Sequence, residues 1–189
     1  AFSADTDGAP QCLLVAGSTL YVGGSFGSVA GQPRLGLAAV NATTGALLPL
    51  AADVDGSVHA LALSGSTLYV GGYFLSIGGQ AREHLAAINA TSGLVAGWAP
   101  APDGEVRALL VNGGSVYAGG YFGTIGGAGR SGLAEVSAAT GLATGWNPAP
   151  DQGVECLARD GGTLYVGGSF GQIGGQSRAL LAAVDLGTG

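Results

Sequence analysis

The chain has 189 residues, of which 47% are hydrophobic and 10% charged, with 38 glycines, no lysine and a formal net charge of −6. This composition is too apolar for a disordered chain, and the glycines interrupt the apolar runs too often for insertion into a membrane. The six arginines are spread through the sequence and form no basic patch that could neutralise phosphates, so we expect no nucleic-acid partner.

One segment of seven residues occurs four times, 48 residues apart, at residues 20–26, 68–74, 116–122 and 164–170. A fixed period of this length indicates a repeat architecture in which each unit packs on the next. We expect a single domain of four repeats, at about residues 9–54, 55–102, 103–150 and 151–189, the last completed by residues 1–8. The chain begins with Ala1 and contains no methionine, which predicts a processed mature protein or a piece of a longer array.

Each repeat is predicted to form four short strands, and repeat 2 shows them in chain order. We expect these strands at residues 58–63, 67–74, 85–88 and 97–102, separated by turns rich in glycine, serine and threonine. Proline cannot donate to a strand ladder, so Pro100 and Pro102 place the fourth strand at the outer edge of its sheet. Four antiparallel strands per repeat predict an all-β fold, a four-bladed β-propeller.

The two ends of the chain predict how the ring closes. Phe2 stands 96 residues before Trp98, so residues 1–8 correspond to the outer strand and loop of a blade. The last repeat stops at Gly189, before its own outer strand. We therefore expect the N-terminal octet to lie beside residues 180–184 and to complete the last blade, which removes the unpaired edge.

Two cysteines occupy one slot of the repeat. Cys12 and Cys156 lie in the first strands of repeats 1 and 4, where the other repeats carry Ala60 and Ala108. In a closed ring of four these repeats are neighbours, so the spacing predicts a disulfide; two free buried thiols are the alternative. A disulfide would indicate an oxidising, extracellular compartment.

Two charged columns recur in every repeat. The first contains Asp7, Asp55, Asp103 and Asp151, and the second contains Arg34, Arg82, Arg130 and Arg178. One interpretation is that each arginine pairs with an aspartate and fixes loop geometry. The other is that the four carboxylates surround the mouth of the tunnel and bind a hard cation such as calcium.

Other polar residues point to modification rather than catalysis. Asn41 and Asn89 begin N-glycosylation sequons, although asparagine is also an ordinary turn residue at these positions. His59 and His84 occupy different slots, and no serine or cysteine stands in a recognisable nucleophile motif. We therefore expect a protein that is not an enzyme and has no cofactor, with calcium at the aspartate column as the alternative.

The consensus L-Y-V-G-G-x-F-x-x-I-G-G-Q-x-R-x-x-L-A-A-V-x-A-x-T-G-x-x-x-x-W-x-P resembles the delta-60 repeat over nearly the whole chain. This resemblance implies a β-propeller-like protein that is secreted or lies at the cell surface. Residues 87–93 with Trp98 are also similar to the tryptophan-docking motif of quinoprotein propellers, which holds adjacent blades together. Phe2 and Leu50 replace the tryptophan in two units, and no match to the quinoprotein ligands is found, so quinoprotein activity is not implied.

Three functions follow as hypotheses. The first is an extracellular binding, adhesion or scaffold module for a protein or a glycan, with Tyr73 and Tyr121 as contact residues. The second is the subunit of an extracellular filament that assembles by exchange of the terminal strand. The third, an enzyme, has the least support in the sequence.

Overall fold

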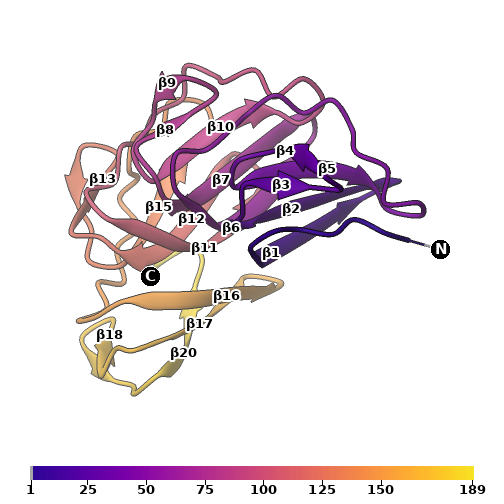
Figure 1. Ribbon diagram of the computed structural model, residues 1–189. Helices are drawn as coiled ribbons and strands as arrows, with labels where there is room; N and C mark the ends of the chain where they lie inside the picture. The colour runs from indigo at the N-terminus through magenta and orange to yellow at the C-terminus, as the bar shows by residue number, and fades with distance from the viewer. Residues whose placement is uncertain (1) are drawn as a thin grey trace. The chain divides into compact units, whose positions relative to one another are not determined.

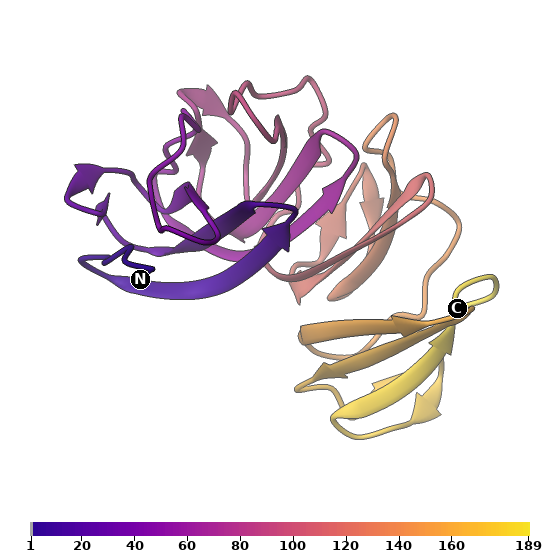
Figure 2. The same cartoon turned by 90° about the vertical axis from the view of Figure 1, so that its right-hand side faces the viewer.

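A computed structural model describes residues 2–189, in which every regular element is a β-strand (Figure 1). None of the described residues belongs to a helix long and apolar enough to cross a membrane. Each repeat forms one three-stranded antiparallel sheet and one small two-stranded ribbon. In Figure 2 the yellow strands of repeat 4 show this arrangement, with the strands of the sheet side by side.

The three-stranded sheets place the second strand of each repeat in the centre. They consist of β1 (Ala9–Ala16), β2 (Thr19–Ser25) and β5 (Leu37–Asn41); β6 (Ser57–Ser64), β7 (Thr67–Tyr73) and β10 (Leu85–Asn89); β11 (Glu105–Asn112), β12 (Ser115–Tyr121) and β15 (Leu133–Ser137); and β16 (Val154–Asp160), β17 (Thr163–Gly168) and β20 (Leu181–Asp185). The first three strands predicted for each repeat are thereby confirmed. Their central strands are rich in β-branched and aromatic residues, which suit a sheet buried on both faces.

The ribbons lie between the second and third strands of each repeat. They are β3 (Ser28–Val29) with β4 (Gln32–Pro33), β8 (Ser76–Ile77) with β9 (Gln80–Ala81), β13 (Thr124–Ile125) with β14 (Ala128–Gly129), and β18 (Gln172–Ile173) with β19 (Gln176–Ser177). The sequence predicted only a turn here. Both residues of the turn between β8 and β9 have positive φ, 56° at Gly78 and 72° at Gly79, and glycine adopts this conformation at no steric cost.

The prediction of a fourth strand at residues 97–102 is wrong. The third strand of repeat 2 has only one bridge at its outer edge, between Ile88 and Val95, and the chain then leaves the sheet. The proline-containing segment instead contacts the following repeat, where the carbonyl of Pro100 accepts a hydrogen bond of 2.7 Å from the Gly126 N–H. A proline offers its carbonyl but no N–H, which explains why this segment makes single contacts rather than a ladder.

The chain divides into two compact units, Ala1–Gly97 (unit 1) and Trp98–Gly189 (unit 2). Each unit has its own core between two repeats. In unit 1 the largest fully buried side chains include Leu50, Leu68 and Ile77, and in unit 2 they include Leu164 and Phe170.

The N-terminal octet contacts repeat 1. The Ala30 N–H donates to the Asp5 carbonyl at 2.8 Å, and Thr6 forms a bridge with Val29. Residues 49–56 make the same kind of contact with repeat 2, where the Gly78 N–H donates to the Asp53 carbonyl at 2.8 Å. Since these bonds belong to repeat 1, closure of the ring by pairing with β20, and with it the count of four blades, stays a prediction.

Candidate functional site

An aspartate in each repeat ties the loop before the first strand to the loop after the second strand. Asp7 Oδ1 accepts hydrogen bonds from the backbone N–H groups of Gly27 (2.8 Å) and Ser28 (2.9 Å). The same pair of bonds recurs from Leu75 and Ser76 to Asp55, from Gly123 and Thr124 to Asp103, and from Gly171 and Gln172 to Asp151. The four aspartates of this column therefore anchor their loops in the same way.

These bonds keep the carboxyl groups ionised. The N–H groups of Ser28 and Gly27 lower the pKa of Asp7 from its usual 3.8. The Thr124 N–H lowers the pKa of Asp103, and this outweighs the opposing effect of burial. At neutral pH each of these loops consequently carries a negative charge.

The predicted pairing of the aspartate and arginine columns is wrong. No ion pair joins the two columns within residues 2–189. Instead Arg82 donates to the backbone carbonyls of Ala81 and Ala96, each at 2.7 Å, and Arg130 donates to those of Gly129 and Thr144. The arginines thus fasten the ribbon to the outer edge of the same repeat. Backbone partners of this kind have no sequence signature, and so charge alone suggested the wrong partner.

The aspartates do not assemble into a recognisable cation site. Residues 2–189 contain no group of three or more His, Cys, Asp or Glu side chains that could hold a metal ion. Moreover, Oδ1 of each aspartate already accepts two N–H groups. Calcium binding stays a prediction that no ligand cluster supports.

Each first strand carries a bulge at the same position. The register of β1 with β2 shifts between Pro10 and Cys12, and the same shift recurs in the other repeats. A bulge redirects the side chain of the extra residue. The bulged residues differ in every repeat: Gln11, His59, Arg107 and Glu155. The residues that end or follow the second strand are serine in two repeats and tyrosine in the other two: Ser25, Tyr73, Tyr121 and Ser169. We call these two columns the bulge rim.

The bulge rim forms a different network in each unit. In unit 1 the Gln11 amide donates to Ser25 Oγ at 3.2 Å, and Ser25 Oγ lies 2.6 Å from Ser57 Oγ. In unit 2 the Tyr121 hydroxyl donates to Glu155 Oε1 at 2.6 Å. The guanidinium of Arg107 lies 5.9 Å from the centre of the Tyr121 ring, within range of a cation–π contact.

The two tyrosines expected to contact a partner lie on this rim. Tyr73 is 64% exposed and Tyr121 is 44% exposed. Tyr73 stacks on His84, with ring centres 5.4 Å apart and planes at 27°. Their role as contact residues stays a prediction.

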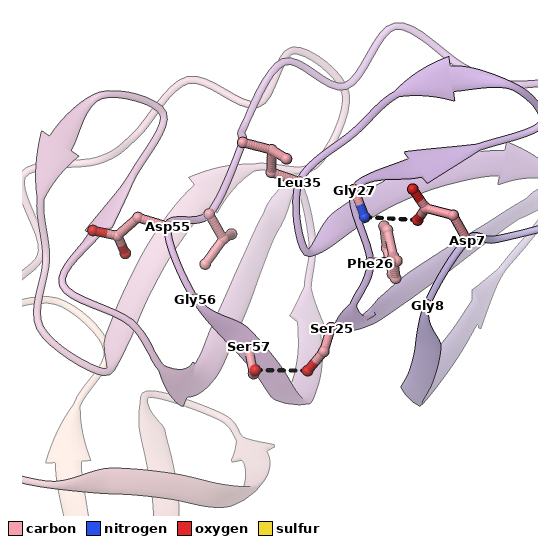
Figure 3. Close-up of a pocket in the computed structure, with 10 residues that line it drawn as sticks. Asp7, Gly8, Ser25, Phe26, Gly27, Leu35, Asp55, Gly56 and Ser57 are labelled. Atoms are coloured by element: carbon pink, nitrogen blue, oxygen red, sulfur yellow. Dashed lines mark hydrogen bonds between the residues drawn. The ribbon is translucent and has the colours of Figure 1, made fainter.

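A hollow of unit 1 lies beside the bulge rim (Figure 3). Its volume is about 510 Å³, and its lining consists of Asp7, Gly8, Ser25, Phe26, Gly27, Leu35, Val54, Asp55, Gly56 and Ser57. Figure 3 shows Asp7 and Asp55 at opposite ends, with the bonded pair Ser25 and Ser57 along one side and Leu35 along the other. Two carboxylates and no basic side chain make the hollow negative, while its walls are partly apolar.

The predicted disulfide is not formed, because Cys12 and Cys156 are both free thiols. Cys12 Sγ lies 3.7 Å from the Val58 carbonyl, on the side of β1 that repeat 2 covers. Burial raises the pKa of Cys12 to about 12, so this thiol stays protonated at neutral pH.

The two sequon asparagines cap their turns. Asn41 Oδ1 accepts the N–H groups of Thr43 and Thr44, each at 2.9 Å, and Asn89 does the same for Thr91 and Ser92. In repeat 4 the carboxylate of Asp185 takes this role. The structure thus shows the turn function, while glycosylation stays a prediction.

The tryptophans dock on the following repeat, as the resemblance to docking motifs implied. Within unit 2 the indole N–H of Trp98 donates to the Ser137 carbonyl, and that of Trp146 donates to the Asp185 carbonyl, both at 2.9 Å. Trp146 also meets the Tyr117 ring edge-on at a centre distance of 5.3 Å. These contacts join repeats rather than bind a ligand.

Sequence reasoning missed Glu135. This carboxylate accepts hydrogen bonds from the hydroxyls of Ser115, Tyr117 and Thr144. Burial, followed by the hydrogen bond to Glu135, raises the pKa of Tyr117 to about 12. The available signal was a single glutamate in a slot where the other repeats carry alanine.

Comparisons with known proteins show the fold alone. No family model and no curated protein matches this sequence. The computationally designed Ika4 protein matches with a TM-score of 0.62 at 15% identity, over 96% of this chain and 94% of that chain. The WD40 repeats of RRP9 match with a TM-score of 0.62 at 15% identity, over 88% of this chain and 48% of that chain. The designed Ika8 protein matches with a TM-score of 0.55 at 16% identity, over 95% of this chain and 59% of that chain.

These similarities define the fold class of the chain. The chain is an all-β repeat protein whose fold is similar to that of a designed repeat protein and of WD40 repeats, and is of the β-propeller kind. It spans about half the length of the RRP9 chain and somewhat more of the Ika8 chain.

Proposed function

We propose that this protein is a non-enzymatic scaffold that binds a protein partner through the hollow of unit 1 and the part of the bulge rim that lies in unit 1, formed by Gln11, Ser25, His59 and Tyr73. The observation that carries the proposal is the contrast between constant and variable positions. Asp7 and Asp55 hold their loops with the same pair of N–H bonds, while the bulged residues of the same repeats, Gln11 and His59, differ. A fixed framework with variable side chains suits recognition rather than catalysis.

The chemistry of the hollow indicates the kind of partner. Carboxylates at its two ends favour a basic side chain, and Leu35, which is 47% exposed, offers an apolar contact. The nearby Tyr73 adds a rigid surface with little rotamer entropy to lose. We therefore expect a peptide segment that combines a lysine or arginine with an apolar residue.

The likeness to WD40 repeats supports the scaffold role at the level of fold only. The extracellular or cell-surface location rests on the resemblance to the delta-60 repeat. A glycan ligand and strand exchange into filaments are the alternatives from the sequence. Strand exchange of the N-terminal octet gains no support from the structure, because Asp5 and Thr6 bond to repeat 1 of their own chain.

A peptide selection tests the proposal. A displayed library of random peptides is selected on the intact protein, and the enriched peptides are measured against Ser25→Tyr. Repeats 2 and 3 carry tyrosine in this slot, so the substitution suits the fold while it fills the hollow. The matched control is Ser169→Tyr, the same change in the same slot of repeat 4.

We expect enriched peptides with a basic and an apolar residue, whose affinity falls at least tenfold in Ser25→Tyr and is unchanged in Ser169→Tyr. Equal affinity for both variants would place binding elsewhere. Enrichment of no peptide, together with binding on a glycan array, would replace the protein partner with a sugar.

A further inference from the structure

The two units differ at one position of the seam between their repeats. In unit 2 this position holds Glu135, whose carboxylate accepts hydrogen bonds from the hydroxyls of Ser115, Tyr117 and Thr144. Tyr117 is 3% exposed and belongs to a core with residues of repeat 4. Unit 2 therefore supplies, from its own chain, the acceptor group for these hydroxyls.

Unit 1 has a hollow beside the residue that replaces Glu135. Ala39 occupies this slot, while Thr19 and Tyr21 keep hydroxyls at the slots of Ser115 and Tyr117. The volume of the hollow is about 140 Å³, and we call it the Ala39 hollow. All of its lining residues belong to repeats 1 and 2, so it lies within unit 1. They include Thr19, Tyr21, Ala39, Leu48, Pro49 and Ala90.

The Ala39 hollow has a buried side and an open side. Tyr21, Ala39 and Ala90 are 5%, 2% and 8% exposed, whereas Pro49 and Thr91 of the lining are exposed. An apolar cavity of about 150 Å³ admits a benzene molecule. The hollow therefore has room for a group of about six heavy atoms that enters from the open side.

The polar groups of the lining determine which atoms such a group needs. The Tyr21 hydroxyl donates to the Ala90 carbonyl at 3.0 Å, and burial raises the pKa of Tyr21, so this donor stays protonated at neutral pH. A hydroxyl oxygen that donates can still accept a hydrogen bond. The hydroxyl of Thr19 can donate one. The hollow thus offers an acceptor and a donor beside the apolar side chains of Leu48 and Pro49.

The charge of the group follows from what unit 1 lacks. In unit 2 Glu135 has a third donor in Thr144, and the positive charge of Arg159 acts on the neighbouring Tyr117. Unit 1 holds leucine in both slots, Leu48 and Leu63. A buried carboxylate with fewer donors and no cation in the lining is costly. A primary amide has a similar shape and avoids this cost.

We propose that the Ala39 hollow binds an uncharged primary amide that carries a short alkyl group. The amide oxygen accepts from the Thr19 hydroxyl, the amide nitrogen donates to Tyr21 Oη, and the alkyl group packs on Leu48 and Pro49. The bond from Tyr21 to Ala90 is kept. A free small amide and the glutamine side chain of a partner share this chemistry. The site has no residue in common with the hollow proposed to bind a peptide and does not depend on that proposal.

A nuclear magnetic resonance titration of the intact protein tests the site. Isobutyramide is the probe, and isobutyrate, which replaces the amide with a carboxylate, is its control. We expect saturable shifts of the backbone amide signals of Tyr21, Ala39 and Ala90, with an affinity for isobutyrate at least about tenfold lower. Saturable binding of N-acetyl-glutamine methylamide at the same signals would assign the site to a partner's side chain. Binding of isobutyramide alone would assign it to a free small molecule.

Substitutions at two lining residues test the assigned contacts. Thr19→Val removes the hydroxyl and keeps the branched shape, so the affinity for isobutyramide is expected to fall at least about tenfold. Thr19→Ser is the matched control, because unit 2 carries serine in this slot, and its affinity should stay close to that of the wild type. Ala39→Gln attaches the proposed group to the chain. It is expected to abolish binding and to raise the midpoint of urea unfolding.

Other outcomes overturn the proposal. Equal affinity of Thr19→Val and the wild type would show that the hydroxyl makes no contact, and equal affinity for isobutyrate would remove the argument from charge. Binding of isobutyramide to Ala39→Gln would place the ligand elsewhere. Shifts that do not saturate, or that occur only in unit 2, would exclude the site. None of these results affects peptide binding at Ser25, which the Ser25→Tyr variant tests separately.

Discussion

The hydroxyl of Tyr21 donates a hydrogen bond of 3.0 Å to the carbonyl oxygen of Ala90, 69 residues further along the chain. This bond joins the second strand of repeat 1 to the outer turn of repeat 2. In unit 2 the hydroxyl of the equivalent Tyr117 donates to Glu135 instead. The indole N–H of Trp146 donates to the outer turn of repeat 4. In unit 1 the position equivalent to Trp146 is Leu50, whose side chain has no hydrogen-bond donor. The hydroxyl of Tyr21 supplies the donor instead.

Tyr21→Phe removes this donor without changing the packing of the ring. We expect a loss of about 1 kcal/mol in the free energy of unfolding, because the Ala90 carbonyl is left without this bond in a buried seam. Urea titration followed by circular dichroism measures the change. Tyr73→Phe is the control, and a highly exposed tyrosine should give a change within about 0.5 kcal/mol. Equal effects in both variants would contradict the role of the Tyr21 bond.

Trp146→Leu introduces the residue that unit 1 already uses in this slot. The variant loses the bond to the Asp185 carbonyl and the edge-on contact with Tyr117. We expect destabilisation by about 2 kcal/mol, from roughly 1 kcal/mol for each interaction. Thermal or urea unfolding measures it, with the remaining Trp98 as the fluorescent reporter. An unchanged midpoint would mean that leucine packs equally well here.

Much of the sheet structure was predictable because its signals are local. The alternation in residues 58–63 and 67–74 and the turn at residues 64–66 gave β6 and β7 to within about a residue. The path of the chain after β10 was not predictable in this way. Pro100 and Pro102 excluded a central strand, but no residue type shows that a segment leaves its own sheet for the next repeat.

The site was harder to predict for a related reason. Asp7 and Arg82 bond to backbone N–H and C=O groups, which every residue offers, so charge suggested an ion pair that does not form. The bulge at His59 likewise depends on strand register and has no composition of its own. By contrast, the docking of Trp98 was predictable because the side chain itself makes the contact.

Asp103 tests the loop anchors and their pH dependence. Asp103→Ala removes the acceptor of two N–H groups, and we expect a loss of about 1 kcal/mol in stability. Asp103→Asn keeps an acceptor oxygen but not the charge, so it should lose less. Because the folded-state pKa of Asp103 lies below the usual 3.8, the stability gained from its ionisation is complete above about pH 4 and is lost as the pH falls below that value.

The difference between wild type and Asp103→Asn should therefore be constant from pH 5 to pH 8 and shrink below pH 4. Urea midpoints at several pH values measure it. A difference that grows towards acid pH would contradict the assigned direction of the pKa shift.

The two thiols should react at very different rates. In dilute native protein at pH 8 we expect one thiol per chain to react rapidly with Ellman's reagent and two to react after denaturation in urea. Cys156 is exposed, whereas burial keeps Cys12 protonated with a pKa of about 12. Cys156→Ser should abolish the rapid phase and Cys12→Ala should retain it. If no thiol reacts in urea until reductant is added, a disulfide exists after all.

Glu135 and Thr144 form a hydrogen-bonded pair that can be tested by single and double substitution. Glu135→Ala leaves the hydroxyls of Ser115, Tyr117 and Thr144 without their shared acceptor, and we expect a loss of about 2 kcal/mol in the free energy of unfolding. Repeat 2 carries alanine in both slots, so the double variant Glu135→Ala with Thr144→Ala recreates an arrangement that the fold already contains. Its cost should be smaller than the sum of the two single costs, because one donor no longer lacks a partner. Urea unfolding of the three variants measures this coupling, and strictly additive costs would show that Thr144 does not share in the network.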